Sequence, residues 1–249
     1  WQDAYDAANN VIALKLYGLT DKYEDAWKGN NKEAILEFDY DAANGPNHLF
    51  DRYYVPQCDG YDNGSTGTPT QEMVECYESK NGEKIDRSNS SQLAKGALPL
   101  KYGMDPDMKD GQSGIDVVIY RYADVLLTLA ECINRNEGSP TTEAIGLVNR
   151  VRKRAGLSEL DDAQTASGEA FNEAILLERG HEFYLEGLRR QDLIRFGKYV
   201  EYANNRIDAI NKSEGRGYFN VHEGHNRFWI PQSFIDESKG AIKQNNYDR

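Results

Sequence analysis

Two short motifs in the sequence carry residue types that commonly bind metal ions. Glu178-Arg179-Gly180-His181 has the ExxH spacing of di-iron carboxylate bundles, which need a second copy and two further glutamates, and the sequence holds one copy. His222-Glu223-Gly224-His225 resembles the HExxH of zinc proteases, but it is one residue short and has Asn226 where the second histidine is needed. Histidines three apart in a glycine-containing loop do not share a helix face as that chemistry requires. We therefore expect no metal site.

Hydrolysis without a metal is not indicated by the residues either. Gln112-Ser113-Gly114 lacks the second half of the GxSxG nucleophile elbow. A glycosidase needs only two carboxylates at a set separation, and with 41 acidic residues the sequence leaves that reaction open without marking any pair. We therefore expect no catalytic residues, no cofactor and no enzymatic activity.

A row of carboxylates follows one face of a predicted helix. Glu178, Glu182 and Glu186 recur every fourth residue, and this spacing stacks them on one helix face, where like charges repel unless they are paired. Four arginines are close enough in sequence to pair with them: Arg179, Arg189, Arg190 and Arg195. We therefore expect a partly buried network of ion pairs that fixes how the last helices cross.

Aromatic residues are the best candidates for ligand contacts, because 16 tyrosines and three tryptophans are present. A tyrosine ring gives a large contact area at low entropic cost and carries a polar group. Four aromatic residues lie in helical or strand patterns and are expected in the core: Tyr23, Trp27, Tyr120 and Tyr122. Tyr53, Tyr54 and Tyr61 lie instead among polar residues, where they form a ligand platform or pack within a loop. We take them as the candidate binding residues, with Gln57, Asp59 and Asn63 as polar partners.

The elements that must position these residues are mainly helical. Residues 1–38 are expected to form a helix over 2–17 that Gly18 ends, a short helix through Trp27, and a strand before residue 39. Residues 115–200 are expected to form a strand over 116–120 and then tetratricopeptide-like helical hairpins. The helices of these hairpins are predicted over 121–135, 142–155 and 169–185, with another from Leu188 to Tyr199 or beyond.

Two regions lack this periodicity. Residues 39–114 are rich in Gly, Asn, Asp, Pro and Ser, which mark turns. A loop-rich segment of this length is either functional or disordered, and its tyrosines favour function because disorder depletes aromatic residues. Residues 201–249 are expected to form an irregular tail with a short helix near 233–237. The chain is thus treated as one region, mainly α, with long loop-rich insertions and minor β structure.

Charge argues against two classes of partner. The net charge of -12, with no basic stripe in the sequence, disfavours nucleic acids, which need a basic surface, and it disfavours an anionic membrane surface. No apolar run approaches the roughly 20 residues of a membrane span. Because Trp1 to Tyr5 read as the middle of a helix, we expect any export signal or lipid anchor to lie upstream. A neutral ligand such as a sugar is compatible with this charge.

Three cysteines without a CxxC pair exclude a dense disulfide framework and a zinc knuckle. Cys132 lies in an apolar helix and is expected to be a buried thiol. A disulfide between Cys58 and Cys76 is left open.

Several stretches, in this order, resemble the SusD/RagB family. They are Leu16–Glu24; Pro69–Tyr77, similar to the family's PTQELVDAY; Tyr120–Leu127 with Ala130-Glu131 and Val148–Gly156; Glu178 through Gly197; and Ile230-Pro231 with Gln244–Tyr247. Asn246 replaces the proline of the family's QNPGY ending. The ordered combination covers nearly the whole chain, although members of the family are usually about twice as long.

The resemblance implies a non-catalytic surface lipoprotein of the outer membrane. Such a protein binds an oligosaccharide or polysaccharide and acts as a lid on a SusC-like TonB-dependent transporter, and its membrane contact is an upstream lipid anchor. Two alternatives remain: a RagB-like peptide-binding protein on the same scaffold, and a tetratricopeptide-like protein–protein adaptor. An adaptor would have an apolar or charged concave groove in place of aromatic residues on the 39–114 loops.

Overall fold

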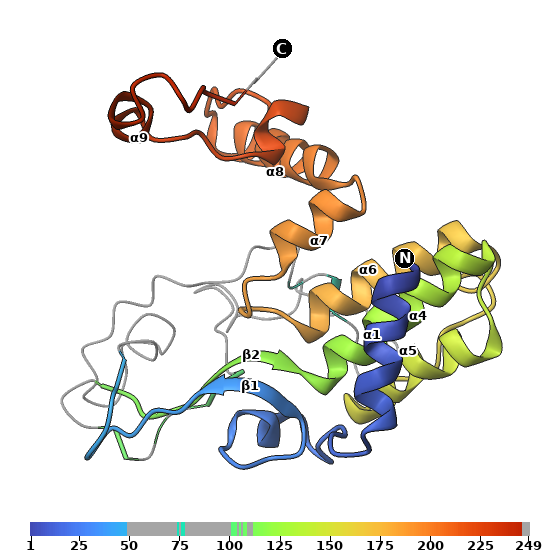
Figure 1. Ribbon diagram of the computed structural model, residues 1–249. Coiled ribbons are helices and arrows are strands. Elements are labelled where there is room, and N and C mark those ends of the chain that lie inside the picture. The colour runs from blue at the N-terminus through green and yellow to red at the C-terminus, as the bar shows by residue number, and fades with distance from the viewer. Residues whose placement is uncertain are drawn as a thin grey trace. The chain divides into compact units, whose positions relative to one another are not determined.

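The chain forms two compact units, Trp1–Glu186 and Gly187–Arg249 (Figure 1). The structure is a computed structural model that describes residues 1–48, 74, 76–77, 101–103, 105, 107–108 and 112–245. Helices dominate both units, which confirms the predicted mainly α fold.

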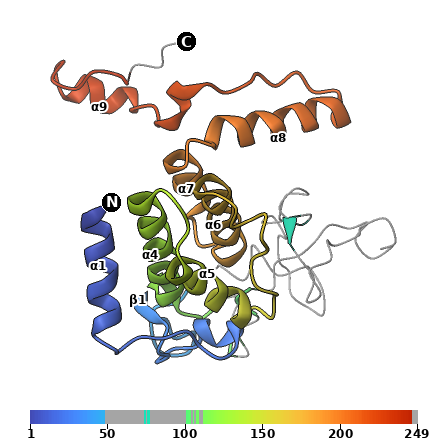
Figure 2. The same cartoon turned by 90° about the vertical axis from the view of Figure 1, so that its right-hand side faces the viewer.

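A layer of helices forms the body of the first unit (Figures 1 and 2). It consists of α1 (Gln2–Ala13), α4 (Tyr122–Glu137), α5 (Thr142–Arg154) and α6 (Gly168–Glu182). α4 lies at the centre and contacts the other three, while α5 also contacts α6. The α4–α5 pair is the predicted helical hairpin.

The sequence explains where these helices start and stop. The apolar face of α4 is fully buried, with Leu126 and Leu127 at 0% exposure, and the thiol of Cys132 is buried in the same helix, as predicted. Thr141 caps α5 by accepting a hydrogen bond from the Ala144 N–H at 3.1 Å, which satisfies a donor that the helix itself cannot. Gly156 has a φ of +80° just beyond α5, the left-handed conformation in which glycine commonly ends helices.

Two helices end earlier than predicted. α1 stops at Ala13, not at residue 17, because Lys15 takes a φ of +56°. α6 stops at Glu182, not at residue 185, and Leu185 takes a φ of +64°. Positive φ breaks a right-handed helix, and the periodic apolar pattern gave no sign of either break.

A small antiparallel sheet lies beside the helices. β1 (Ala34–Phe38) pairs with β2 (Val117–Arg121), and Leu36 is opposite Tyr120. Tyr120 is 53% exposed, so its predicted place in the core is wrong: the pair with Leu36 occupies the solvent face of the strands. Trp27, in the short helix η1 (Tyr23–Trp27), is buried as predicted.

The second unit contains α7 (Arg189–Arg195), α8 (Tyr199–Glu214), η3 (Glu223–Asn226) and α9 (Gln232–Glu237). Irregular structure was expected from residue 201, but α8 continues through Glu214, so this expectation was wrong for residues 201–214. Side-chain amides organise this unit. Asn204 exchanges two hydrogen bonds with the backbone of Val221 (2.7 and 3.0 Å), and Asn211 does the same with Tyr218 (2.8 and 2.8 Å). These bonds hold the segment after α8 along the helix.

Two glycines within helices are expected to respond oppositely to alanine. A Cβ at Gly168 would lie 2.6 Å from the backbone oxygen of Gly138, so Gly168→Ala should destabilise the chain by about 1–3 kcal/mol through overpacking. A Cβ added at Gly146, in α5, would meet no atom within 4 Å, so Gly146→Ala should stabilise the chain by up to about 1 kcal/mol. Denaturant midpoints measure both changes. Shifts in the same direction would contradict the close approach of Gly168 to Gly138.

Candidate functional site

The candidate ligand residues lie outside the part of the chain that the structure describes. This holds for all six: Tyr53, Tyr54, Gln57, Asp59, Tyr61 and Asn63. Cys58 lies outside it as well, so the disulfide with Cys76 stays an open question. The structure does describe how other residues of the 39–114 segment attach to the helices.

The end of α6 anchors two parts of this segment. The Tyr77 hydroxyl donates to the His181 carbonyl at 3.0 Å, and the Tyr102 hydroxyl donates to the Leu185 carbonyl at 3.2 Å. The Lys101 ammonium donates to the Tyr184 carbonyl at 2.6 Å. The early end of α6 at Glu182 leaves these carbonyls without helical partners, and the segment supplies the donors.

The first and last parts of the segment are tied to each other. The backbones of His48 and Ser113 form a bridge with N···O distances of 2.8 and 3.1 Å, and His48 Nε2 lies 2.8 Å from the Ile115 carbonyl oxygen. The Tyr40 N–H donates to an Asp116 carboxylate oxygen at 2.8 Å. The segment is therefore closed at its base, the arrangement in which loops on a rigid scaffold carry function.

Arg121 is the centre of a buried charge network that is linked to these anchors through Lys101 and Glu186. It comes from the end of β2, is 1% exposed, and makes five hydrogen bonds, as many as a guanidinium can donate. Two go to Glu186, each at 2.8 Å, and one goes to Glu33 at 2.8 Å. The Glu182 carboxylate and the Glu182 carbonyl oxygen accept the other two.

Two further cations complete the network. Arg154 pairs with Glu33 at 3.0 Å and with Glu182, and Lys101 pairs with Glu186. Three cations thus meet three carboxylates, and each side chain is at most 5% exposed. The Lys101 ammonium also lies 4.7 Å from the centroid of the Trp27 ring. Because every charge has a partner of opposite sign, the cluster suits a structural role.

The predicted network of glutamates is therefore present, but its main partners differ from those expected. Arg121, Arg152 and Arg154 pair with the carboxylates of 178–186; the Arg152–Glu178 distance is 3.0 Å. The expected arginines have other contacts: Arg179 with Asp124 at 2.7 Å, Arg195 with Asp192 at 2.9 Å, Arg190 with the His225 carbonyl at 3.0 Å, and Arg189 with the Tyr202 ring at 5.4 Å.

Burial and ion pairing shift the pKa values of two groups in the network, Glu182 and Lys101. Burial acts to raise the pKa of Glu182, but Arg121 and Arg154 hold that pKa below its usual range. Burial lowers the pKa of Lys101 to about 8, although Glu186 acts in the opposite direction. At neutral pH the carboxylate and the ammonium therefore both remain charged, as their ion pairs require.

Tyr23 and Tyr77 are expected to make the fold less stable at high pH. Burial is the largest cause that raises the pKa of both hydroxyls above the usual value, followed by Glu182 for Tyr23 and Cys76 for Tyr77. A pKa raised by folding stabilises the folded state below the unfolded-state pKa of about 10, and that stability is lost as the pH rises toward the folded-state value.

Unfolding midpoints measured from pH 9 to 12 should therefore fall less steeply in Tyr23→Phe and Tyr77→Phe than in the parent. Comparison with the parent separates the tyrosines from Lys101, whose lowered pKa has the opposite effect on stability between about pH 8 and 10.5. Tyr120→Phe, on the exposed sheet face, is the control. Equal slopes in all four proteins would rule out the buried-hydroxyl explanation.

The two histidine motifs have structural contacts. His181 Nε2 lies 3.2 Å from Cys76 Sγ, and the Tyr77 ring stacks on the imidazole at 4.6 Å. His222 Nδ1 accepts from the Gly224 N–H at 3.3 Å, and His225 Nδ1 accepts from the His222 N–H at 3.2 Å. The second motif is thus a helix cap on η3 and not a pair of ligands on one helix face.

One acidic cluster was not singled out from the sequence. Glu37, Asp39 and Asp116 each place an oxygen within 4.8 Å of the others. Burial, followed by the charges of Asp116 and Asp39, raises the pKa of Glu37. Such clusters are common without an ion, so the expectation of no metal stays a prediction.

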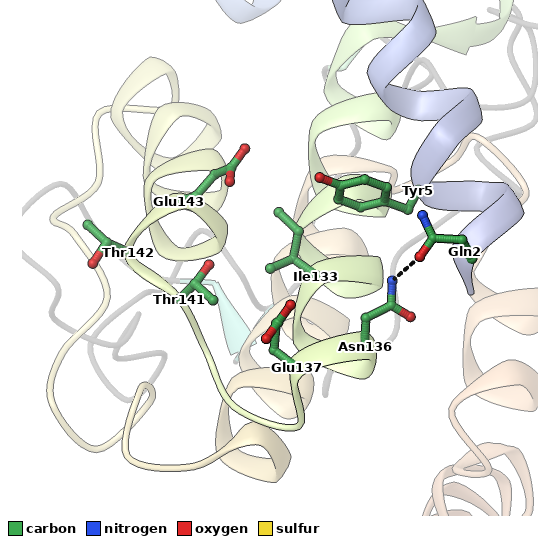
Figure 3. Close-up of a pocket in the computed structure, with 8 residues that line it drawn as sticks. All are labelled: Gln2, Tyr5, Ile133, Asn136, Glu137, Thr141, Thr142 and Glu143. Carbon is green, nitrogen blue, oxygen red and sulfur yellow. Dashed lines mark hydrogen bonds between the residues drawn. The ribbon is translucent and has the colours of Figure 1, made fainter.

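A pocket of about 540 Å³ lies in the helical layer (Figure 3). It is lined by residues of α1, of the end of α4 and of the start of α5: Gln2, Tyr5, Ile133, Asn136, Glu137, Thr141, Thr142 and Glu143. None of these residues was singled out in the sequence.

Across the described ranges, no helix is both long and apolar enough to cross a bilayer.

Comparison with known proteins gives related sequences and folds. A sequence model of the SusD family matches residues 96–247. The starch-binding protein SusD of Bacteroides thetaiotaomicron is 32% identical over 149 residues, which cover 60% of this chain and 23% of that protein. SusD-like protein P38 of Formosa agariphila is 36% identical over 107 residues, covering 41% of this chain and 20% of that protein.

Solved structures show the same fold over nearly the whole chain. Surface glycan-binding protein A from Bacteroides thetaiotaomicron, solved in complex with laminarihexaose, has a TM-score of 0.72 at 24% identity. The match covers 98% of this chain and 59% of that chain, so the chain spans less than two thirds of the length of these relatives. Because the family model matches more than half of the residues, the chain belongs to the SusD family.

Proposed function

We propose that this chain is part of a non-catalytic, cell-surface glycan-binding protein. Its membership of the SusD family carries the proposal, because relatives in that family are a starch-binding protein and a glycan-binding protein with bound laminarihexaose. The composition is consistent with it: the negative charge disfavours polyanionic partners, and tyrosines are concentrated near polar residues at positions 53–63.

The proposal extends to location and partner. The protein acts at the outer membrane as a lipid-anchored surface protein and delivers oligosaccharide to a SusC-like TonB-dependent transporter. The anchors of the 39–114 segment to the end of α6 support a ligand-binding role for that segment, since a closed base limits the entropy that the loops lose on binding.

Calorimetry tests the proposal with maltohexaose, laminarihexaose and a set of unrelated peptides as titrants. We expect heat of binding with at least one oligosaccharide, and no release of reducing sugar from the corresponding polysaccharide. Binding of peptides but not of sugars would replace the proposal with the peptide-binding alternative. Sugar release that a single carboxylate substitution abolishes would contradict the non-catalytic role.

A further inference from the structure

The pocket of Figure 3 is built by three helices that hold one another in place. α4 contacts both α1 and α5, and the Asn136 amide of α4 lies 3.5 Å from the Gln2 side-chain oxygen of α1. Thr141, at the opposite wall, is fixed as the cap of α5. The pocket has a volume of about 540 Å³ and is open to solvent, because five of its eight lining residues are exposed: Gln2, Asn136, Glu137, Thr142 and Glu143.

The lining combines one buried apolar side chain and a half-buried ring with polar, mostly exposed residues, which form its polar rim. Ile133 of α4 is buried at 6% exposure, and the half-buried Tyr5 ring of α1 lies beside it (Figure 3). The rim carries amides from Gln2 and Asn136, and hydroxyls and carboxylates from the start of α5 and the end of α4. An aromatic ring next to hydrogen-bonding groups matches a sugar ring, which has apolar C–H faces and polar edges.

Charge narrows the ligand class further. Glu137 and Glu143 both line the pocket, and none of the described lining side chains is cationic. Anionic ligands would be repelled here, and apolar peptide anchors would displace water from the exposed amides and carboxylates without replacing its hydrogen bonds. A neutral polyhydroxylated ligand fits both conditions, because hydroxyl groups donate to carboxylates and accept from amides.

We propose that this pocket is a second carbohydrate subsite, built from residues outside the 39–114 segment. Tyr5 supplies the stacking ring, and the Gln2 and Asn136 amides hold the hydroxyls of a neutral oligosaccharide. This proposal rests on the proposed function for its ligand class, but it assigns different residues.

Side-chain amide signals test the subsite directly. In the chain labelled with ¹⁵N at asparagine and glutamine, maltohexaose or laminarihexaose should shift the Gln2 and Asn136 amides, and trigalacturonate should not. Tyr5→Ala should weaken this binding about tenfold, the effect of losing one well-placed contact. Tyr202→Ala, an exposed tyrosine of α8, and Asn10→Ala, an exposed residue of α1, are the matched controls and should bind like the parent.

The outcomes separate this proposal from the previous one. Shifts at Gln2 and Asn136 that weaken only in Tyr5→Ala support the subsite. Two results overturn the subsite and leave the proposed function standing. One is heat of binding without shifts of these amides, and the other is a Tyr5→Ala variant that binds the sugar as tightly as the parent does. Tighter binding of trigalacturonate overturns the ligand class, and no binding of any sugar overturns both proposals.

Discussion

Arg121→Ala is expected to destabilise the first unit by at least roughly 3–5 kcal/mol, or to prevent folding. The substitution removes five hydrogen bonds and one of the three cations of the network. The buried carboxylates of Glu33, Glu182 and Glu186 then share only two cations, Lys101 and Arg154. Removing one partner of a buried ion pair typically has this cost, because the remaining charge keeps its desolvation penalty. Denaturant unfolding followed by circular dichroism measures the change.

Two milder substitutions keep the test informative if Arg121→Ala does not fold. Arg121→Lys keeps the charge but cannot make five bonds in a fixed plane, and Glu182→Gln keeps the shape of a carboxylate that accepts from both Arg121 and Arg154. Arg150→Ala is the matched control, since Arg150 is exposed on α5 and surface substitutions stay within about 0.5 kcal/mol. If the three network variants and the control all have the midpoint of the parent, the network has no role in stability.

The helices of the first unit were predictable because their apolar residues repeat with the helical period. Ala123, Leu126, Leu127 and Ala130 of α4 recur at helical spacing in the sequence and are all fully buried. α8 was missed although Val200, Ala203, Ile207 and Ile210 recur at helical spacing. These residues are only half-buried in the structure, and across the described residues 199–214 of α8 none is fully buried. Local bonds such as those of Asn204 and Asn211 hold this region, and they leave no periodic pattern.

The charge network was only half predictable. The spacing of Glu178 and Glu182 indicated that carboxylates would need partners, but Arg121 lies 61 residues before Glu182, at the junction of a strand and a helix. Sequence spacing identifies neighbours along a helix and not partners that the fold brings together. An arginine at the end of an otherwise apolar strand, Val117–Arg121, was the one available signal, since such a charge is rarely buried without partners.

The largest effect on ligand binding is expected from Tyr53→Ala, Tyr54→Ala and Tyr61→Ala. These tyrosines belong to the 39–114 segment. Other residues of that segment, Tyr77, Lys101 and Tyr102, donate hydrogen bonds to backbone carbonyls at the end of α6. If a ring is a true platform, its loss should weaken glycan binding by about 2 kcal/mol, or roughly 30-fold in Kd. Stability should barely change, because a ring that contacts ligand contributes little to the core.

Salt and a matched ring distinguish this effect from an indirect one. Stacking needs no charge, so the affinity of the parent and the loss in each variant should be nearly the same at low and at high ionic strength. Tyr120→Ala removes a ring that is 53% exposed on the sheet, outside residues 39–114, and should bind like the parent. Calorimetry with the best oligosaccharide measures each Kd. If all three variants bind like the parent, the platform lies elsewhere, and a loss confined to Tyr5→Ala would place the main site in the helical pocket.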